Sequence, residues 1–209
     1  NPDWKMAARW VCSPALRGQE DRDYLWNALN EGWLSVLGSD NASIPMYQKE
    51  WGWDEEKGCC DFRKIPNGCP GAGDRLYALW TYGVAAGRMS RQKFVDICST
   101  TPAKLNGLYP RKGTIQVGSD ADLVLFDPDY HGTITLETNP TGVEYNIFEG
   151  LDQIGRAETV LLRGKVVVDQ GKYVGTPGEG QFIPGKPYGK LAHHGLYPFI
   201  DNHCLICVR

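Results

Sequence analysis

The sequence predicts an α/β fold in its first half and a β-rich region in its second. Two short apolar segments, residues 8–12 and 34–37, flank a stretch in which apolar residues recur at helical spacing. Helical patterns continue up to about residue 105, whereas from Gly113 onward short apolar runs alternate with Gly, Pro and Asp turns. This change of pattern places a boundary near residue 112.

The first 37 residues predict a parallel crossover unit. Residues 8–12 and 34–37 are expected to be strands, and residues 20–32 a helix with Leu25 and Leu29 on one face and Gly32 at its end. A strand, a helix and a second strand joined by short connections are typical of parallel sheets. Residues 39–74 then form a long loop, and loops of that length usually carry function.

Three more helices are expected before the boundary. The first spans residues 76–84, Ser90 is a candidate N-cap for the second, and Thr101-Pro102 begins the third. After residue 113, "GTIQVGSDADLVLFDPD" and "GTITLET" look like strands, and "TVLLRGKVVVDQGKYV" predicts hairpins that turn at Arg163-Gly164 and Gln170-Gly171. Residues 1–112, 113–175 and 176–209 are therefore separate regions, the last an extended tail packed on the surface or on a partner subunit.

Composition narrows the class of protein. The 209 residues carry a net charge of −3, which gives no reason to expect nucleic acid or an anionic membrane surface as a partner. No apolar run approaches the roughly 20 residues of a membrane span. There is no signal-peptide pattern, and the abrupt start without Met suggests a fragment of a longer chain.

Seven cysteines without a disulfide pattern favour a reducing, cytoplasmic compartment. The Cys204-Leu-Ile-Cys207 motif after His203 stands alone at the C-terminus, so a zinc role there is disfavoured.

Asp40 is the first candidate functional residue, because it follows the apolar segment 34–37 directly after Gly38 and Ser39. In α/β folds the carboxyl ends of strands feed the loops that line ligand sites. The alternative is that Asp40 merely caps the following turn.

Several motifs occur in one order: "VCSPALR", "LGSDN", "DFRKIPNG", "STTPAKLNGLYPRKGTIQVGSDADLVLFDPD" and "YNIFEG". Through them the chain resembles the C-terminal part of the dihydropyrimidinases and hydantoinases, in the cyclic amidohydrolase superfamily. The resemblance covers roughly residues 1–190. It implies the last strands and helices of a metal-dependent (β/α)8 TIM barrel, followed by strands of a smaller β-sandwich.

The resemblance also implies roles for three residues. Asp40 matches the Asp at the end of the eighth barrel strand, which binds one of two Zn²⁺ ions and handles the proton of the attacking water. Ser13 and Asn67 match residues that hold the cyclic amide, largely through main-chain groups. The alternatives are a strand-ending turn at Ser13 and ordinary Asn-Gly turn chemistry at Asn67.

Other polar groups are expected to be structural. Arg111 and Lys112 fit a surface hairpin, and Asp120 and Asp122 fit a turn that anchors sheet edges. Asn41 stands where the family usually has His.

The chain lacks the His-x-His pair, the bridging lysine and the further histidines that a two-metal site requires. Its four histidines are His131, His193, His194 and His203. We therefore expect an incomplete, C-terminal portion of a hydrolase that opens a dihydropyrimidine or 5-substituted hydantoin to an N-carbamoyl amino acid, and that is inactive alone. A homotetramer is implied by the family. The alternative is a non-catalytic scaffold of the collapsin response mediator type, which lacks the "GSDN" and "IPNG" pattern kept here. Allantoinase or another ring-opening relative fits "IPNG" with "YPRKG" less well.

Overall fold

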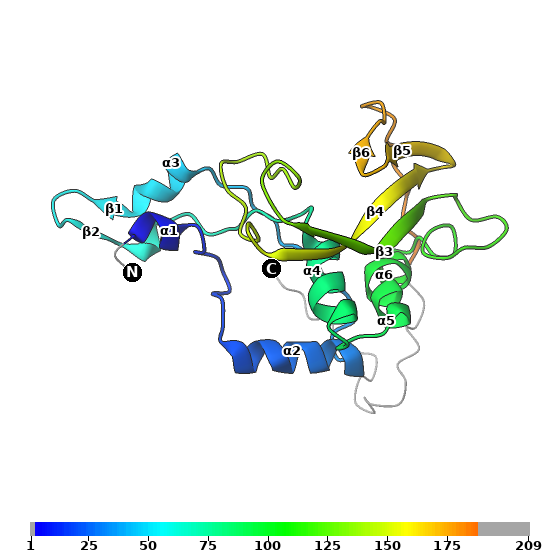
Figure 1. The fold of residues 1–209 in the computed structure, drawn as a ribbon, viewed down its shortest axis with the longest axis horizontal. Coiled ribbons are helices and arrows are strands. Elements are labelled where there is room, and N and C mark those ends of the chain that lie inside the picture. Colours follow the sequence, from blue (N-terminus) through cyan, green and yellow to red (C-terminus); the bar gives the residue numbers. More distant parts are fainter. Residues whose placement is uncertain (1–2, 188–209) are drawn as a thin grey trace.

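A computed structural model describes residues 3–187 (Figure 1). The helical elements are α1 (Trp4–Ala8), α2 (Gln19–Glu31), α3 (Met46–Lys49), η1 (Glu50–Gly52), η2 (Phe62–Lys64), α4 (Arg75–Leu79), η3 (Trp80–Ala85), α5 (Arg91–Val95), η4 (Asp96–Thr100) and α6 (Thr101–Leu105). The strands are β1 (Trp53–Asp54), β2 (Cys59–Cys60), β3 (Leu123–Thr133), β4 (Asp152–Leu162), β5 (Lys165–Asp169) and β6 (Lys172–Tyr173). No helix among residues 3–187 is long and apolar enough to cross a membrane.

Helix α2 forms where the sequence predicts it. Glu20 and Asp21 lie in its first turn, where carboxylates interact favourably with the free backbone N–H groups. Gly32 ends the helix with φ +82°, and its N–H donates to the carbonyls of Ala28 and Leu29. A left-handed residue at this position is a common helix stop, and glycine adopts it without strain.

The two strands expected on either side of α2 are absent, so that prediction is wrong. Ala8 belongs to helix α1, and residues 34–37 lie in neither of the two sheets. A strand exists only when a neighbouring segment takes up its N–H and C=O groups. No described segment pairs with residues 34–37 as a strand, and the Leu34 N–H donates instead to the Ala28 carbonyl at 3.1 Å.

The predicted helices between residues 75 and 105 are confirmed, and they build the core. Ser90 caps α5 by accepting a hydrogen bond from the Lys93 N–H at 3.1 Å, and Pro102 lies in the first turn of α6. The helical run from α4 continues through the π-helical segment η3. The buried core combines α2, this run and α5, through Leu29, Leu79, Trp80, Met89, Phe94 and Ile97.

The strands β3 to β6 form one antiparallel sheet in sequential order. Both predicted hairpin turns are confirmed: Arg163 and Gly164 have φ +49° and +81°, and Gln170 and Gly171 have +50° and +74°. Two successive positive φ angles match the right-handed twist of a tight hairpin. The expected strand over residues 113–122 is not formed, because that stretch folds into turns.

The sheet and the helices share one core. Thr81 of η3 donates to the carbonyl of Ile154 at 3.2 Å and accepts from its N–H at 2.9 Å. Phe126 of β3 packs against Trp80, with ring centroids 4.6 Å apart. Helices α4 to α6 therefore lie against β3 and β4, while α1, α3, β1 and β2 gather at the opposite end (Figure 1).

Asp120 and Asp122 have the structural role predicted for them. Asp120 pairs with Arg111 at 2.8 Å and with Lys112 at 2.9 Å, and Asp122 accepts from the Arg163 N–H at 2.8 Å. The pairs fold residues 111–122 back onto the β4–β5 turn.

The described part of the tail, residues 176–187, contains no helix or strand. Its Lys186 N–H donates to the Gly107 carbonyl at 3.0 Å, and the Glu179 carbonyl accepts from Arg163 at 2.7 Å. His193, His194, His203, Cys204 and Cys207 lie outside the described residues.

Candidate functional site

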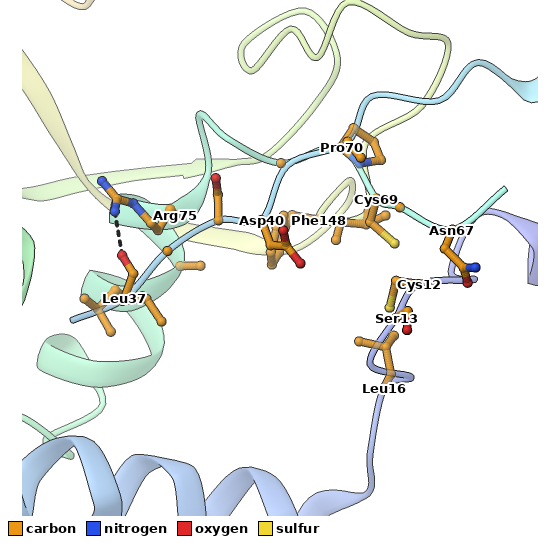
Figure 2. Close-up of a pocket in the computed structure, with 18 of the residues that line it drawn as sticks. Cys12, Ser13, Leu16, Leu37, Asp40, Asn67, Cys69, Pro70, Arg75 and Phe148 are labelled. Atoms are coloured by element: carbon orange, nitrogen blue, oxygen red, sulfur yellow. Dashed lines mark hydrogen bonds between the residues drawn. The ribbon is translucent and has the colours of Figure 1, made fainter. Parts of the chain in front are cut away.

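A cavity of about 510 Å³ lies between α2, α4 and the loops at residues 12–16, 37–42, 67–71 and 147–148 (Figure 2). Ser13, Asp40 and Asn67 all line it, although they are up to 54 residues apart in the sequence (67 − 13). Leu16, Trp26, Leu37, Leu79 and Phe148 supply much of the apolar lining. The structure therefore brings together the three residues singled out from the sequence.

Asp40 lies in a segment that is fixed on both sides. Its own φ is +47°, a left-handed conformation that Asp and Asn tolerate better than most residues. On one side Arg75 of α4 donates to the Leu37 carbonyl at 2.6 Å (Figure 2). On the other side the Ala42 N–H donates to the Cys69 carbonyl at 3.1 Å. These bonds hold the Asp40 backbone at the wall of the cavity.

Asn41, which replaces the usual His of the family motif, contacts backbone instead of the cavity. Its side-chain oxygen accepts from the N–H groups of Gly71 at 3.0 Å and Ala72 at 3.2 Å. Asn41 is not among the residues that line the cavity. It thereby ties the Asp40 segment to the turn that precedes α4.

The Ser13 and Asn67 segments are joined directly by backbone. The Gly68 N–H donates to the Val11 carbonyl at 3.0 Å, so the residue after Asn67 is bonded to the residue two before Ser13. Neither segment is a helix or strand. Ser13 and Asn67 thus lie on two irregular segments that are hydrogen-bonded to each other through their backbones.

A model of the amidohydrolase family matches residues 5–167. The chain belongs to the amidohydrolase family.

Named relatives of this amidohydrolase chain are hydantoinases and dihydropyrimidinases, so the resemblance read from the motifs is confirmed. It is 47% identical over 184 residues to a D-hydantoinase of Geobacillus stearothermophilus, covering 88% of this chain and 38% of the relative. It is 41% identical over 194 residues to a dihydropyrimidinase of Rattus norvegicus, covering 92% of this chain and 36% of the relative. The chain thus spans less than two fifths of the length of these relatives.

Solved structures give the same result. A D-hydantoinase (dihydropyrimidinase) from Thermus sp. superimposes with a TM-score of 0.82 at 44% identity, covering 88% of this chain and 39% of that one. An L-hydantoinase (dihydropyrimidinase) from Arthrobacter aurescens superimposes with a TM-score of 0.76 at 33% identity, with coverages of 88% and 40%. The segments around the cavity therefore have the conformation of an amidohydrolase fold.

The amidohydrolase family is metal-dependent, and the described residues offer a small part of a metal site. They contain no group of three or more His, Cys, Asp or Glu side chains that could hold an ion. Asp40 contributes one carboxylate, a hard oxygen ligand that suits a divalent cation. One such ligand does not retain a metal ion at useful affinity.

Lys49 is a residue that the sequence analysis missed. Its side chain is 0% exposed, and its ammonium group donates to the carbonyls of Val11 at 3.0 Å, Pro66 at 2.8 Å and Gly68 at 2.7 Å. Burial lowers the pKa of Lys49, and the neighbouring thiols of Cys69 and Cys12 oppose that shift. No local pattern distinguishes this lysine from the exposed ones in the same loop.

Two thiols lie in the cavity wall beside Lys49. The Cys12 thiol donates to the Pro14 carbonyl and the Cys69 thiol to the Arg9 carbonyl, each at 3.4 Å. Burial raises the pKa of Cys69 to about 11, and the adjacent Cys12 thiol adds to the shift. A Cys69 thiol with this pKa is protonated at neutral pH.

A buried carboxylate fixes the remaining wall. Asp74 accepts from the side-chain amides of Asn139 at 2.6 Å and Asn146 at 2.7 Å, and burial raises its pKa. The Asn146 side chain in turn accepts from the Phe148 N–H at 2.8 Å. This network places Phe148 in the cavity wall, where a Cβ on Gly71 would lie 2.8 Å from its ring.

Proposed function

We propose that this chain is the C-terminal portion of a metal-dependent hydrolase that opens a cyclic amide, a dihydropyrimidine or a 5-substituted hydantoin, to an N-carbamoyl amino acid. The observation that carries the proposal is the meeting of Ser13, Asp40 and Asn67 in the wall of one cavity. The names of the relatives, hydantoinase and dihydropyrimidinase, support the same substrate class.

In this proposal Asp40 is a metal ligand and the group that moves the proton. A bound divalent ion, which we propose is one of two Zn²⁺, supplies Lewis-acid chemistry and activates the attacking water. The Asp40 carboxylate accepts a proton from that water. When the water oxygen has bonded to the ring carbonyl carbon and the C–N bond breaks, Asp40 gives the proton to the departing nitrogen.

Ser13 and Asn67 orient the ring. A cyclic imide presents alternating N–H and C=O groups, which rigid backbone groups can pair one by one. The segments that carry Ser13 and Asn67 are joined by the 3.0 Å bond between Gly68 and Val11, which supports a fixed spacing between them. Apolar residues such as Leu16 and Phe148 would face the ring substituent.

The wider architecture belongs to the same proposal. Residues 1–112 complete a (β/α)8 barrel, residues 113–175 are strands of a β-sandwich, and residues 176–209 are a tail. In this proposal residues 34–37, which lie outside both sheets here, become a barrel strand when neighbouring strands are present. We also propose a cytoplasmic homotetramer.

The test is ring opening of dihydrouracil and 5-phenylhydantoin by the zinc-supplemented full-length protein, compared with its Asp40→Ala variant. We expect the full-length protein to turn over substrate and the Asp40→Ala variant to lose that activity. The rates on the two rings then show whether a ring substituent is preferred. A folded, zinc-loaded protein without turnover on either ring would instead support a non-catalytic scaffold.

A further inference from the structure

We propose that Lys49 is a positioning residue for ring opening, which sets the spacing between the two substrate-binding segments. This inference rests on the proposed function, since it assigns a task to a residue outside the reacting atoms. Lys49 lies in α3, within the long loop that follows Asp40, and it does not line the cavity itself.

The three bonds of Lys49 join the backbone at both binding residues. Val11 precedes Ser13 by two positions, while Pro66 and Gly68 are the residues on either side of Asn67. One ammonium group donates to all three carbonyls, at 2.7 to 3.0 Å. The carbonyls that flank Asn67 are thereby held at Lys49.

The charge state of this site shows why a lysine is used. An ammonium group has three N–H donors, and here each one has a carbonyl partner. Among the described residues no carboxylate pairs with Lys49, and the titratable groups that face it are the thiols of Cys12 and Cys69. A buried ammonium is costly unless its donors are satisfied. An apolar side chain at this position would leave these carbonyls without the donor they now have, whereas the ammonium both satisfies them and draws them to one point.

Lys49 also acts on the Asp40 segment through Gly68. Gly68 has φ +144°, and a Cβ on it would lie 2.5 Å from the Ala42 Cβ, so its backbone is in close contact with the segment that carries Asp40. The next residue, Cys69, accepts the Ala42 N–H at 3.1 Å. A shift of residues 66–68 would therefore change the distances between Ser13, Asn67 and Asp40 together.

The test is steady-state kinetics of the full-length, metal-loaded protein with Lys49→Met, Lys49→Arg and Lys49→Ala. Lys57→Met is the matched control, because Lys57 lies in the same loop with its side chain 71% exposed. We expect KM to rise and kcat/KM to fall by about a hundredfold in Lys49→Met, because an error of about 1 Å in substrate placement has that effect. KM does not depend on the folded fraction, so a purely structural role would leave it unchanged.

Chemical rescue gives a second measurement. Propylammonium has the carbons and the nitrogen that Lys49→Ala lacks beyond Cβ, and we expect it to lower KM in that variant, whereas neutral 1-propanol does not. If Lys49→Met does not fold, the KM of Lys49→Arg tests the proposal instead. Its planar head cannot reach three converging carbonyls, so KM still rises.

The outcomes separate the two proposals. An active wild-type protein whose Lys49 variants keep the wild-type KM overturns the role of Lys49 and leaves the proposed function intact. A wild-type protein without turnover overturns the proposed function, and this inference with it.

Discussion

Asp40 combines a left-handed backbone with the charge that the proposed chemistry requires. Its φ of +47° suits Asp, Asn and Gly, and strains other residues by roughly 1–2 kcal/mol. The backbone therefore restricts the residue type at this position independently of catalysis. A substitution at Asp40 changes stability through φ and activity through the carboxylate, and the two effects can be separated.

Asp40→Asn is expected to keep the fold and lose the reaction. Asn tolerates the same φ but neither binds a metal ion as a carboxylate nor carries a proton, so turnover of the full-length protein falls by about a hundredfold or more. Asp40→Ala loses the same activity and is also less stable, because Ala is strained at positive φ. Thermal melting and turnover of both variants check this. Full activity in Asp40→Asn would remove Asp40 from the mechanism.

The buried thiol of Cys69 makes the free energy of unfolding depend on pH in the alkaline range. Burial raises its pKa to about 11, from about 9 in an exposed thiol, so between these values the folded state binds more protons than the unfolded state. Stability therefore falls as pH rises through that window. Urea unfolding of the isolated chain at pH 8 and pH 10.5, compared with Cys69→Ala, measures it. We expect a smaller pH-dependent loss in the variant, and equal losses would contradict this interpretation of Cys69.

Elements whose formation depends on residues nearby in the sequence could be predicted from the sequence. Elements that need a partner far away in the sequence could not. Helix α2 and the turn at Arg163-Gly164 follow from local signals, namely apolar spacing, a glycine stop and a turn dipeptide. Residues 34–37 lack a ladder partner among residues 3–187, which no local pattern reveals. The motifs found Ser13, Asp40 and Asn67, but Lys49 is recognisable only from three carbonyls that converge in space.

The link between α4 and residues 139–148 depends on the buried Asp74. Its two oxygens accept from two side-chain amides, at 2.6 and 2.7 Å. Asp74→Asn has nearly the same shape but offers a donor to one of these amides. We expect it to lower the free energy of unfolding by about 1–3 kcal/mol, the cost of an unsatisfied buried group.

Urea unfolding of Asp74→Asn measures the loss, with Asp129→Asn as the control because Asp129 is exposed. A matching midpoint in the two variants would mean that the network contributes little to stability.

At the scale of the whole molecule, several large apolar side chains among the described residues face solvent. Leu16 is 60% exposed and Trp33 55% exposed, and both lie in the segments that flank α2. Burial of such large apolar side chains is favourable, so their exposure here suits contact with further elements of a fold. The chain spans 38% of a D-hydantoinase to which it is 47% identical, which supports the proposal that further barrel elements cover these residues.

The 209-residue chain alone is therefore expected to open no ring and to retain no metal ion. The described residues offer no cluster of three metal-binding side chains, and a single carboxylate is too weak a ligand set. Zinc titration by calorimetry and turnover of dihydrouracil, each measured on the isolated chain and on the full-length protein, check both statements. We expect activity and tight zinc binding in the full-length protein only. Ring opening by the isolated chain would show that its own residues complete the site, and would require a ligand set beyond Asp40.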